Sequence, residues 1–287
     1  MGGWRDDLTR GRKPVEWRPA SQVSRQSAFW GQRPMANILS YRIGSPRKPQ
    51  LALGRVKALG IPCVEIDLGP DEDAAETKKF LAAHGLRAAT LTAPCPLADP
   101  KLFDIFENYC AKAATLGCSG LFTSIHAGQM PLDDAYARLR HIGDTAARHG
   151  VKIGMETHPD LCENGAKGAA TMAAVAHPAV GINYDTANVY YYNEGIDTVE
   201  EVAKEARYVV SVHLKDTMGG YHDGNFPDFG KGVVDFAGVF RVLNGVGFSG
   251  PFTMELEGAG TTSSDPAAQE AHVRACVEHL RGLGLVP

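Results

Sequence analysis

The sequence predicts an α/β protein with the (β/α)8 barrel fold, known as a TIM barrel, formed by a single domain behind an N-terminal extension. From residue 35 onward, short apolar runs alternate with longer amphipathic segments. Strict alternation of this kind indicates a parallel sheet with right-handed crossovers. The remaining chain of about 250 residues has the usual size of such a barrel. No Gly-x-Gly-x-x-Gly motif opens the first unit, which disfavours a nucleotide-binding open sheet.

Eight segments are expected to form the strands of this barrel. They are Asn37–Ile43, Cys63–Asp67, Ala88–Thr92, Gly120–Ile125, Lys152–Glu156, Val180–Asp185, Tyr208–Leu214 and Pro251–Leu256. Two of the intervening segments place apolar residues on one helical face, the first with Leu102, Phe106, Tyr109, Ala113 and Leu116, and the second with Leu132, Ala135, Leu139, Ile142 and Ala146. Asp235 is expected to cap the seventh helix, and residues 267–283 to form the eighth.

Composition excludes several classes of protein. The 287 residues carry a net charge of −4, with 44% hydrophobic and 22% charged residues, as in an ordinary globular protein. The mild acidity argues against non-specific nucleic-acid binding. No uncharged apolar stretch reaches the length of a membrane span. The six cysteines form no Cys-x-x-Cys pair, so we expect reduced thiols in a cytoplasmic protein.

Residues 1–34 differ from the rest of the chain. They hold all three tryptophans and many arginines, without a helical or strand period or the apolar core of a secretory signal. Two interpretations remain open: a poorly ordered or partner-contacting arm, or an extension ahead of a natural start at Met35. The second is favoured, and residues 35–287 then form the barrel.

Strands five to eight share one pattern of alternation. In the fifth, Ile153 and Met155 have one parity, which we assign to the helix-facing side, and Glu156 has the other. Polar residues on the inner face need a reason, because a barrel strand is buried on both faces. Active sites of barrels lie at the C-terminal ends of the strands. The inner parity places a metal-capable side chain at each of these four ends: Glu156, Asp185, His213 and Glu255.

Three carboxylates and an imidazole in one partly dry mouth would repel one another, at a cost of several kcal/mol for each unpaired charge. One divalent cation removes that cost. Three oxygen donors and one nitrogen leave two positions of an octahedron free, which suits Mn²⁺ best, with Mg²⁺, Co²⁺ and Zn²⁺ as alternatives. Any one of these residues could instead be an ordinary salt-bridged barrel residue, and the register shared by four consecutive strands favours the metal site.

Four motifs carry a resemblance to a known family. They are Met155-Glu156-Thr157-His158, Asn183-Tyr184-Asp185-Thr186, His213-Leu214-Lys215-Asp216 and the closing stretch from Gly230 to Glu257. With them, the chain from Met35 to its end resembles the xylose-isomerase-like sugar phosphate isomerase/epimerase barrels, a superfamily shared with apurinic-site endonucleases. The resemblance implies that the same quartet binds the metal, and that Glu156 and Glu255 transfer protons through a metal-stabilised enediolate.

The implied activity is a metal-dependent isomerase or epimerase of a sugar, keto-sugar or inosose. Three positions depart from typical ketose 3-epimerases. Asn188 stands where they have a substrate-binding histidine, Gly219 stands where they have an arginine, and Cys162 stands where they have a second glutamate. A lyase that uses the same site for β-elimination, like inosose dehydratases or C-glycoside deglycosidase subunits, is therefore the alternative. A repair endonuclease is disfavoured by the acidic charge, and a non-catalytic barrel subunit remains open.

Further side chains near the strand ends are candidates for binding the substrate: His126, His158, Asn188, Lys215, Glu65 and Glu257. Each could equally be a structural residue, and Glu65 could hold a basic side chain. The long segment from Thr217 to Lys231 is expected to be functional, either over the substrate or against a partner subunit. The expected partner is a small sugar, with no nucleic acid or membrane, and a homo-oligomer or hetero-subunit is possible.

Overall fold

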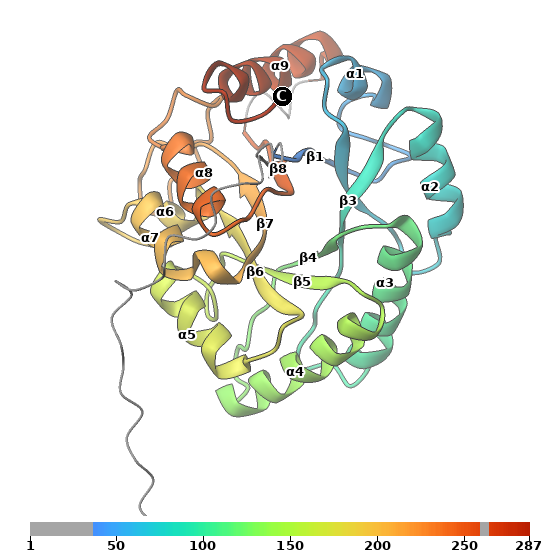
Figure 1. The fold of residues 1–287 in the computed structure, drawn as a ribbon, viewed down its shortest axis with the longest axis vertical. Coiled ribbons are helices and arrows are strands. Elements are labelled where there is room, and N and C mark those ends of the chain that lie inside the picture. The colour runs from blue at the N-terminus through green and yellow to red at the C-terminus, as the bar shows by residue number, and fades with distance from the viewer. Residues whose placement is uncertain (1–36, 259–263) are drawn as a thin grey trace, which may run out of the picture. The chain divides into compact units, whose positions relative to one another are not determined.

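The computed structural model describes residues 37–258 and 264–287. Within these ranges, eight parallel strands close into a barrel in the order of the sequence, and the helices form a ring around it (Figure 1). The predicted (β/α)8 barrel is therefore confirmed. The extension predicted for residues 1–34 lies outside the described residues.

The strands match the predicted segments to within two residues at every end. They are β1 (Leu39–Gly44), β2 (Cys63–Asp67), β3 (Arg87–Thr92), β4 (Gly120–Thr123), β5 (Lys152–Glu156), β6 (Val180–Asp185), β7 (Val209–Leu214) and β8 (Phe252–Met254). β8 pairs with β1, and this pairing closes the sheet. The largest differences are two residues: β1 begins two residues later than predicted, and β4 and β8 end two residues earlier.

The helices occupy the predicted connections. They are α1 (Leu53–Ala58), α2 (Ala74–Ala83), α3 (Leu102–Leu116), α4 (Leu132–Arg148), α5 (Gly165–Val175), α6 (Asn188–Tyr191), α7 (Thr198–Glu205), α8 (Phe236–Gly245) and α9 (Pro266–Gly282), with a 3-10 turn at Ala206–Tyr208. The apolar face predicted for α3 is buried throughout. In α4 the prediction is wrong at Leu132, which is 45% exposed, because it is the first residue of the helix and the face that packs on the barrel begins a turn later, at Ala135.

Aspartate side chains begin four of these helices. Asp73, Asp197, Asp235 and Asp265 each accept hydrogen bonds from backbone N–H groups of the first turn of α2, α7, α8 and α9. An N-cap of this type satisfies donors that the helix itself cannot pair. The predicted capping role of Asp235 is confirmed.

The interior layer below the site is made of small and polar side chains. Ser211 of β7 donates a hydrogen bond of 2.6 Å to Oδ1 of Asn183 in β6. A Cβ atom at Gly154 of β5 would lie only 2.7 Å from the Ser211 hydroxyl. A side chain at position 154 would therefore displace the Ser211 hydroxyl from this hydrogen bond.

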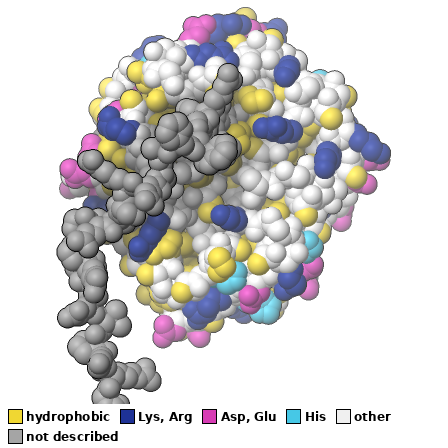
Figure 2. All heavy atoms as spheres, viewed as in Figure 1, with side chains coloured by type: hydrophobic (Ala, Val, Ile, Leu, Met, Phe, Trp, Pro, Cys, Tyr) yellow, Lys and Arg dark blue, Asp and Glu magenta, His cyan; other side chains and the backbone are white. Residues whose placement is uncertain are grey.

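Membrane-spanning helices, basic patches and disulfides were also sought in the structure. No helix in the two described ranges is long and apolar enough to cross a membrane. On the face in Figure 2, Lys and Arg side chains are scattered singly rather than gathered into one basic patch. The six cysteines are all free, and five are buried.

Glu205, at the end of α7, gives a prediction about stability. Its side chain is fully buried, and neither carboxylate oxygen has a hydrogen-bond partner. Burial, with a smaller contribution from Glu201, raises the pKa of Glu205 well above 4.5. The folded state therefore holds this proton more tightly than the unfolded chain, and stability is lost as the pH rises from about 4.5 through the folded-state pKa.

Glu205→Gln is expected to raise the free energy of unfolding at pH 7 and to remove a pH dependence of up to about 1.4 kcal/mol per pH unit. Urea denaturation between pH 5 and 8 measures both effects. Glu200→Gln on the exposed side of the same helix is the matched control. If the free energy of unfolding of Glu205→Gln depends on pH as steeply as that of the wild type, the Glu205 carboxyl is not the source of the pH dependence.

Candidate metal centre

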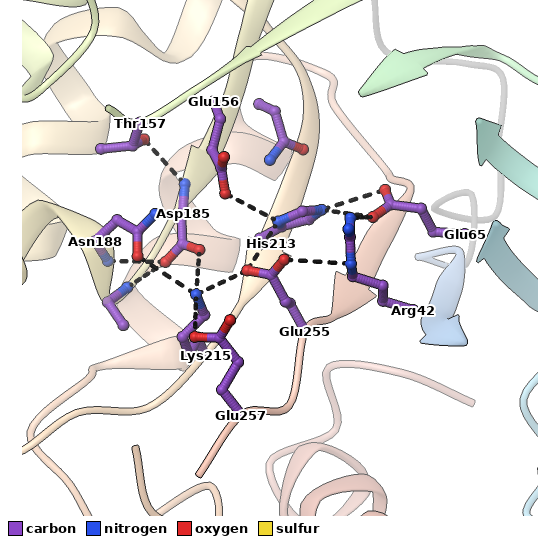
Figure 3. Close-up of polar contacts among 12 residues, drawn as sticks. Arg42, Glu65, Glu156, Thr157, Asp185, Asn188, His213, Lys215, Glu255 and Glu257 are labelled. Carbon is purple, nitrogen blue, oxygen red and sulfur yellow. Dashed lines mark hydrogen bonds and ion pairs between the residues drawn. The ribbon is translucent and has the colours of Figure 1, made fainter. Parts of the chain in front are cut away.

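The four side chains selected by strand parity meet at the mouth of the barrel. Glu156, Asp185 and His213 lie at the ends of β5, β6 and β7, and Glu255 follows β8 directly. All four are buried, and one ligand-capable atom of each lies within 4.8 Å of the others (Figure 3). The structure thus brings together the complete predicted quartet.

The imidazole of His213 is oriented by a buried carboxylate. Its Nε2 lies 3.0 Å from Oε1 of Glu65. The same carboxylate accepts hydrogen bonds from Arg42 Nη1 at Oε1, at 2.8 Å, and from Thr90 Oγ1 at Oε2, at 2.7 Å. With a metal ion bound, a proton on Nε2 would be held by Glu65, and Nδ1 would be the nitrogen that faces the ion. Metal-binding histidines are commonly oriented by such a second carboxylate.

Two buried polar atoms at the centre of the quartet fit a bound cation. Nδ1 of His213 lies 3.2 Å from Oε2 of Glu255 and 3.7 Å from Oε1 of Glu156, yet it forms no well-directed hydrogen bond. Oδ2 of Asp185 also lacks a well-directed hydrogen bond, and its nearest cation is the ammonium of Lys215 at 3.2 Å. Lone pairs of a nitrogen and several oxygens that face one another are repulsive unless a proton or a cation lies between them. The donor set of three carboxylates and one imidazole fits a divalent ion.

Glu156 is held as a carboxylate. Burial opposes its ionisation, but the neighbouring imidazoles of His158 and His213 prevail and lower its pKa to about 2. His158 Nδ1 lies 2.8 Å from Oε2 of Glu156, and the hydroxyl of Ser124 donates to the same oxygen. Glu255 is similar: His213 and Lys215 overcome burial and lower its pKa well below 4.5. Both glutamates are therefore ionised at neutral pH.

Lys215 supplies a positive charge beside the quartet. Its buried ammonium lies 2.7 Å from Glu255 Oε2, 3.2 Å from Asp185 Oδ2 and 3.1 Å from Glu257 Oε2. These carboxylates outweigh burial and raise the pKa of Lys215 well above its usual value. For Asp185, burial is the largest effect, and with the charges of Glu255 and Glu156 it outweighs Lys215 and raises the pKa to about 6.

A cavity of about 710 Å³ opens above the quartet. Six of the predicted site residues line it: Glu156, His158, Asn188, Lys215, Glu255 and Glu257. Asp185 and His213 are fully buried and do not line this cavity. Glu65 is also fully buried and contacts His213 instead of the cavity. His126 is exposed, and its Nδ1 contacts the carbonyl oxygen of Pro159.

Arg42 is a site residue that the sequence reasoning missed. It lies in β1, lines the cavity, and contacts Glu65 and Glu255 with its guanidinium. The guanidinium carbon also lies 5.0 Å from the ring centre of Phe122. The signal was available, because Arg42 has the parity of Ser40 and opposes the buried Tyr41 and Ile43.

The long segment after β7 forms one wall of the cavity. Gly224 and Phe226 line it, and the ring centre of Phe226 is 5.1 Å from the ammonium of Lys215. The buried carboxylate of Asp216 anchors the segment by accepting four backbone N–H bonds of 2.8–3.2 Å, from Thr217, Gly230, Gly232 and Val234. The prediction that this segment lies over the substrate is therefore consistent with its position.

Fold and site define a TIM-barrel protein with a candidate metal centre at the C-terminal ends of its strands. The family model described as xylose isomerase-like TIM barrel matches residues 53–281. The chain belongs to this family, as its sequence motifs predicted.

Named relatives are sugar epimerases. L-ribulose-5-phosphate 3-epimerase UlaE of Salmonella paratyphi C is 31% identical over 151 residues, which are 52% of this chain and 51% of the relative. UlaE of Escherichia coli is 39% identical over 82 residues, which are 29% of this chain and 28% of the relative. The chain thus matches about half, or less, of the length of these curated relatives.

Solved structures share the fold. D-allulose 3-epimerase from Methylomonas sp. is 20% identical, with a TM-score of 0.69 over 86% of this chain and 98% of that chain. D-psicose 3-epimerase from Clostridium cellulolyticum H10 is 14% identical, with a TM-score of 0.68 over 87% of this chain and 99% of that chain. At these identities the likeness establishes the architecture alone.

Proposed function

We propose that the protein is a divalent-metal-dependent sugar epimerase or isomerase that works by proton transfer next to a ketone. The observation that carries the proposal is the placement of Glu156 and Glu255. They come from non-adjacent strands of a closed barrel, both are ionised, and both line the cavity while belonging to the metal-capable quartet. A substrate above the quartet would meet one carboxylate from each strand.

In the proposed reaction, one glutamate removes the proton alpha to the carbonyl and becomes a carboxylic acid. The other takes a proton from solvent and returns it to the opposite face of the same carbon, and the first then releases its proton to solvent. A divalent ion held by Glu156, Asp185, His213 and Glu255, Mn²⁺ as the first expectation, would polarise the carbonyl and stabilise the enediolate. Lys215 and Asn188 hold substrate oxygens, because both line the cavity. Their Nζ and Oδ1 atoms lie 3.4 Å apart, so they would contact neighbouring oxygens of one substrate.

His158 acts by positioning in this proposal. It holds one oxygen of Glu156 together with Ser124, which leaves the second carboxylate oxygen for the ion or the proton. The relatives named above are epimerases, and this favours return of the proton to the same carbon over elimination.

Incubation of the metal-loaded protein with free and phosphorylated ketoses in deuterated water tests the proposal. NMR is expected to show deuterium at the carbon next to the carbonyl and the appearance of the epimer or isomer, both abolished by a chelator and restored by Mn²⁺. Release of water or of a substituent would establish elimination instead. Absence of exchange with every ketose, with and without added metal, would contradict the proposed function.

A further inference from the structure

We propose that the substrate of this site is an uncharged sugar and that the site rejects sugar phosphates. This inference rests on the proposed epimerase function and goes beyond it, since the curated relatives named above are 5-phosphate epimerases. Four features of the cavity and of the segments around it carry the inference.

The cations of the cavity are already neutralised. Among the described lining residues, Arg42 and Lys215 are the two permanent cations. Arg42 lies 2.8 Å from Glu65, 3.5 Å from Glu255 and 3.8 Å from Asp67. Lys215 contacts three carboxylates, those of Asp185, Glu255 and Glu257. Neither cation has an unopposed charge to offer a phosphate dianion.

Carboxylates outnumber the cationic side chains of the site. Four line the cavity, Asp67, Glu156, Glu255 and Glu257, and Asp185 and Glu65 lie directly behind them. Even when the imidazoles of His158 and His213 are counted as cations beside Arg42 and Lys215, six carboxylates exceed four cations by two, and one divalent ion would only balance that excess. A site without net positive charge does not attract a phosphate dianion, whereas a neutral sugar needs no such attraction.

The helix N-termini that serve phosphate groups in many barrels are occupied. Such sites use the segments after β7 and β8 together with a helix N-terminus. In this chain, Asp235 accepts the N–H of Gly238 at the start of α8, and Asp265 accepts the N–H of Ala267 at the start of α9. Each carboxylate occupies N–H groups that a phosphate would need and places a negative charge beside them.

Within the described part of the segment after β7, a cluster of backbone donors is also filled from within the chain. Gly230, Gly232 and Val234 point their N–H groups at one position after β7, which is the geometry of an anion-binding nest. The carboxylate of Asp216 occupies this position and is 1% exposed. The nest therefore anchors the segment that forms the cavity wall and is closed to a ligand anion.

The rest of the lining suits a neutral polyol. Phe122, Phe226 and Tyr192 supply aromatic surface. The amide of Asn188 can donate and accept hydrogen bonds, and the rim carboxylates of Asp67 and Glu257 can accept them from hydroxyl groups. Carboxylates and amides that bind hydroxyls need no counter-charge on the ligand.

Matched pairs of ketoses test the inference on the metal-loaded full chain. L-ribulose is compared with L-ribulose 5-phosphate, and D-allulose with D-allulose 6-phosphate, by kcat/KM for solvent deuterium exchange. For each pair in which exchange occurs, we expect the free ketose to be preferred about tenfold or more. A phosphorylated ketose that reacts as fast as its free partner, or faster, would overturn the inference and leave the epimerase proposal standing.

If no ketose reacts, the proposed epimerase function is wrong, and binding affinities then test whether the site rejects phosphate esters. Calorimetric titration of the metal-loaded full chain compares L-ribulose with L-ribulose 5-phosphate. Equal or tighter binding of the phosphate ester contradicts a phosphate-rejecting site, and weaker binding supports it.

Two variants locate the source of the discrimination. Asp67→Asn and Glu257→Gln remove rim charges with little change of volume, and each is expected to shift the preference toward the phosphate ester by about threefold or more. Glu107→Gln, which removes an exposed carboxylate of α3, is the matched control and should leave the ratio unchanged. Identical ratios in the rim variants and the control would contradict the electrostatic cause.

Discussion

Glu156→Gln and Glu255→Gln are each expected to lower the rate of epimerisation by about 10³-fold or more. Each substitution removes a proton-transfer group, an effect typically worth 10²–10⁴-fold, and also replaces a charged candidate ligand of the metal by a neutral amide. Steady-state rates measured at saturating Mn²⁺, with the metal content of each variant determined, separate the two losses.

Exchange from the two epimers distinguishes the roles of the two glutamates. If each carboxylate serves one face of the reacting carbon, a variant loses deuterium exchange from one epimer and retains a measurable part of it from the other. The pattern is expected to reverse between Glu156→Gln and Glu255→Gln. This reversal would assign the base for each direction.

Glu107→Gln is the control for these variants as well, because it lies on the outer face of α3 and pairs with Arg148 and His149. Wild-type turnover in a metal-loaded Glu156→Gln or Glu255→Gln protein would show that the site is not catalytic. A non-catalytic barrel subunit would then be the better description of the chain.

Glu65→Gln is expected to weaken binding of the divalent ion by about 10–100-fold, although Glu65 does not belong to the quartet. Its charge holds the proton on Nε2 of His213 at 3.0 Å and so keeps Nδ1 free for a metal. The amide has the same shape but can present an N–H group to the imidazole, and it also removes the partner of Arg42. Competition with a chelating indicator dye measures the dissociation constant.

Thr90→Val is the graded control for this effect. It removes only the 2.7 Å hydrogen bond to Glu65 and leaves the carboxylate charge in place, so a smaller loss of affinity is expected. A dissociation constant for Glu65→Gln within twofold of the wild type would mean that His213 does not need this carboxylate to bind the ion.

The barrel and the quartet were predictable because strand parity is a local property. Buried strands with alternating side chains fix which residues point inward, and parallel strands bring their C-terminal ends to one rim. Glu156, Asp185, His213 and Glu255 follow from these two rules. The same rules apply to Arg42, which has the inward parity in β1 and was not predicted.

Contacts made by long side chains and irregular segments could not be predicted from spacing. Glu65 has the inward parity, but its distance of 148 residues from His213 in the sequence hides their hydrogen bond. Asp216 is the last residue of one motif, yet its role depends on four N–H groups of a segment without regular structure. Leu132 was predicted to be buried but is exposed, because the helical period alone does not tell where the helix begins to pack on the barrel.

A crystal structure of Mn²⁺-loaded protein, with anomalous scattering recorded at the manganese edge, tests the central claim most directly. We expect one strong anomalous peak per chain at about 2.0–2.3 Å from side-chain atoms of Glu156, Asp185, His213 and Glu255. The account is contradicted if manganese is absent from this position while Lys215 remains bound to Asp185 and Glu255, or if the ion binds at another part of the chain.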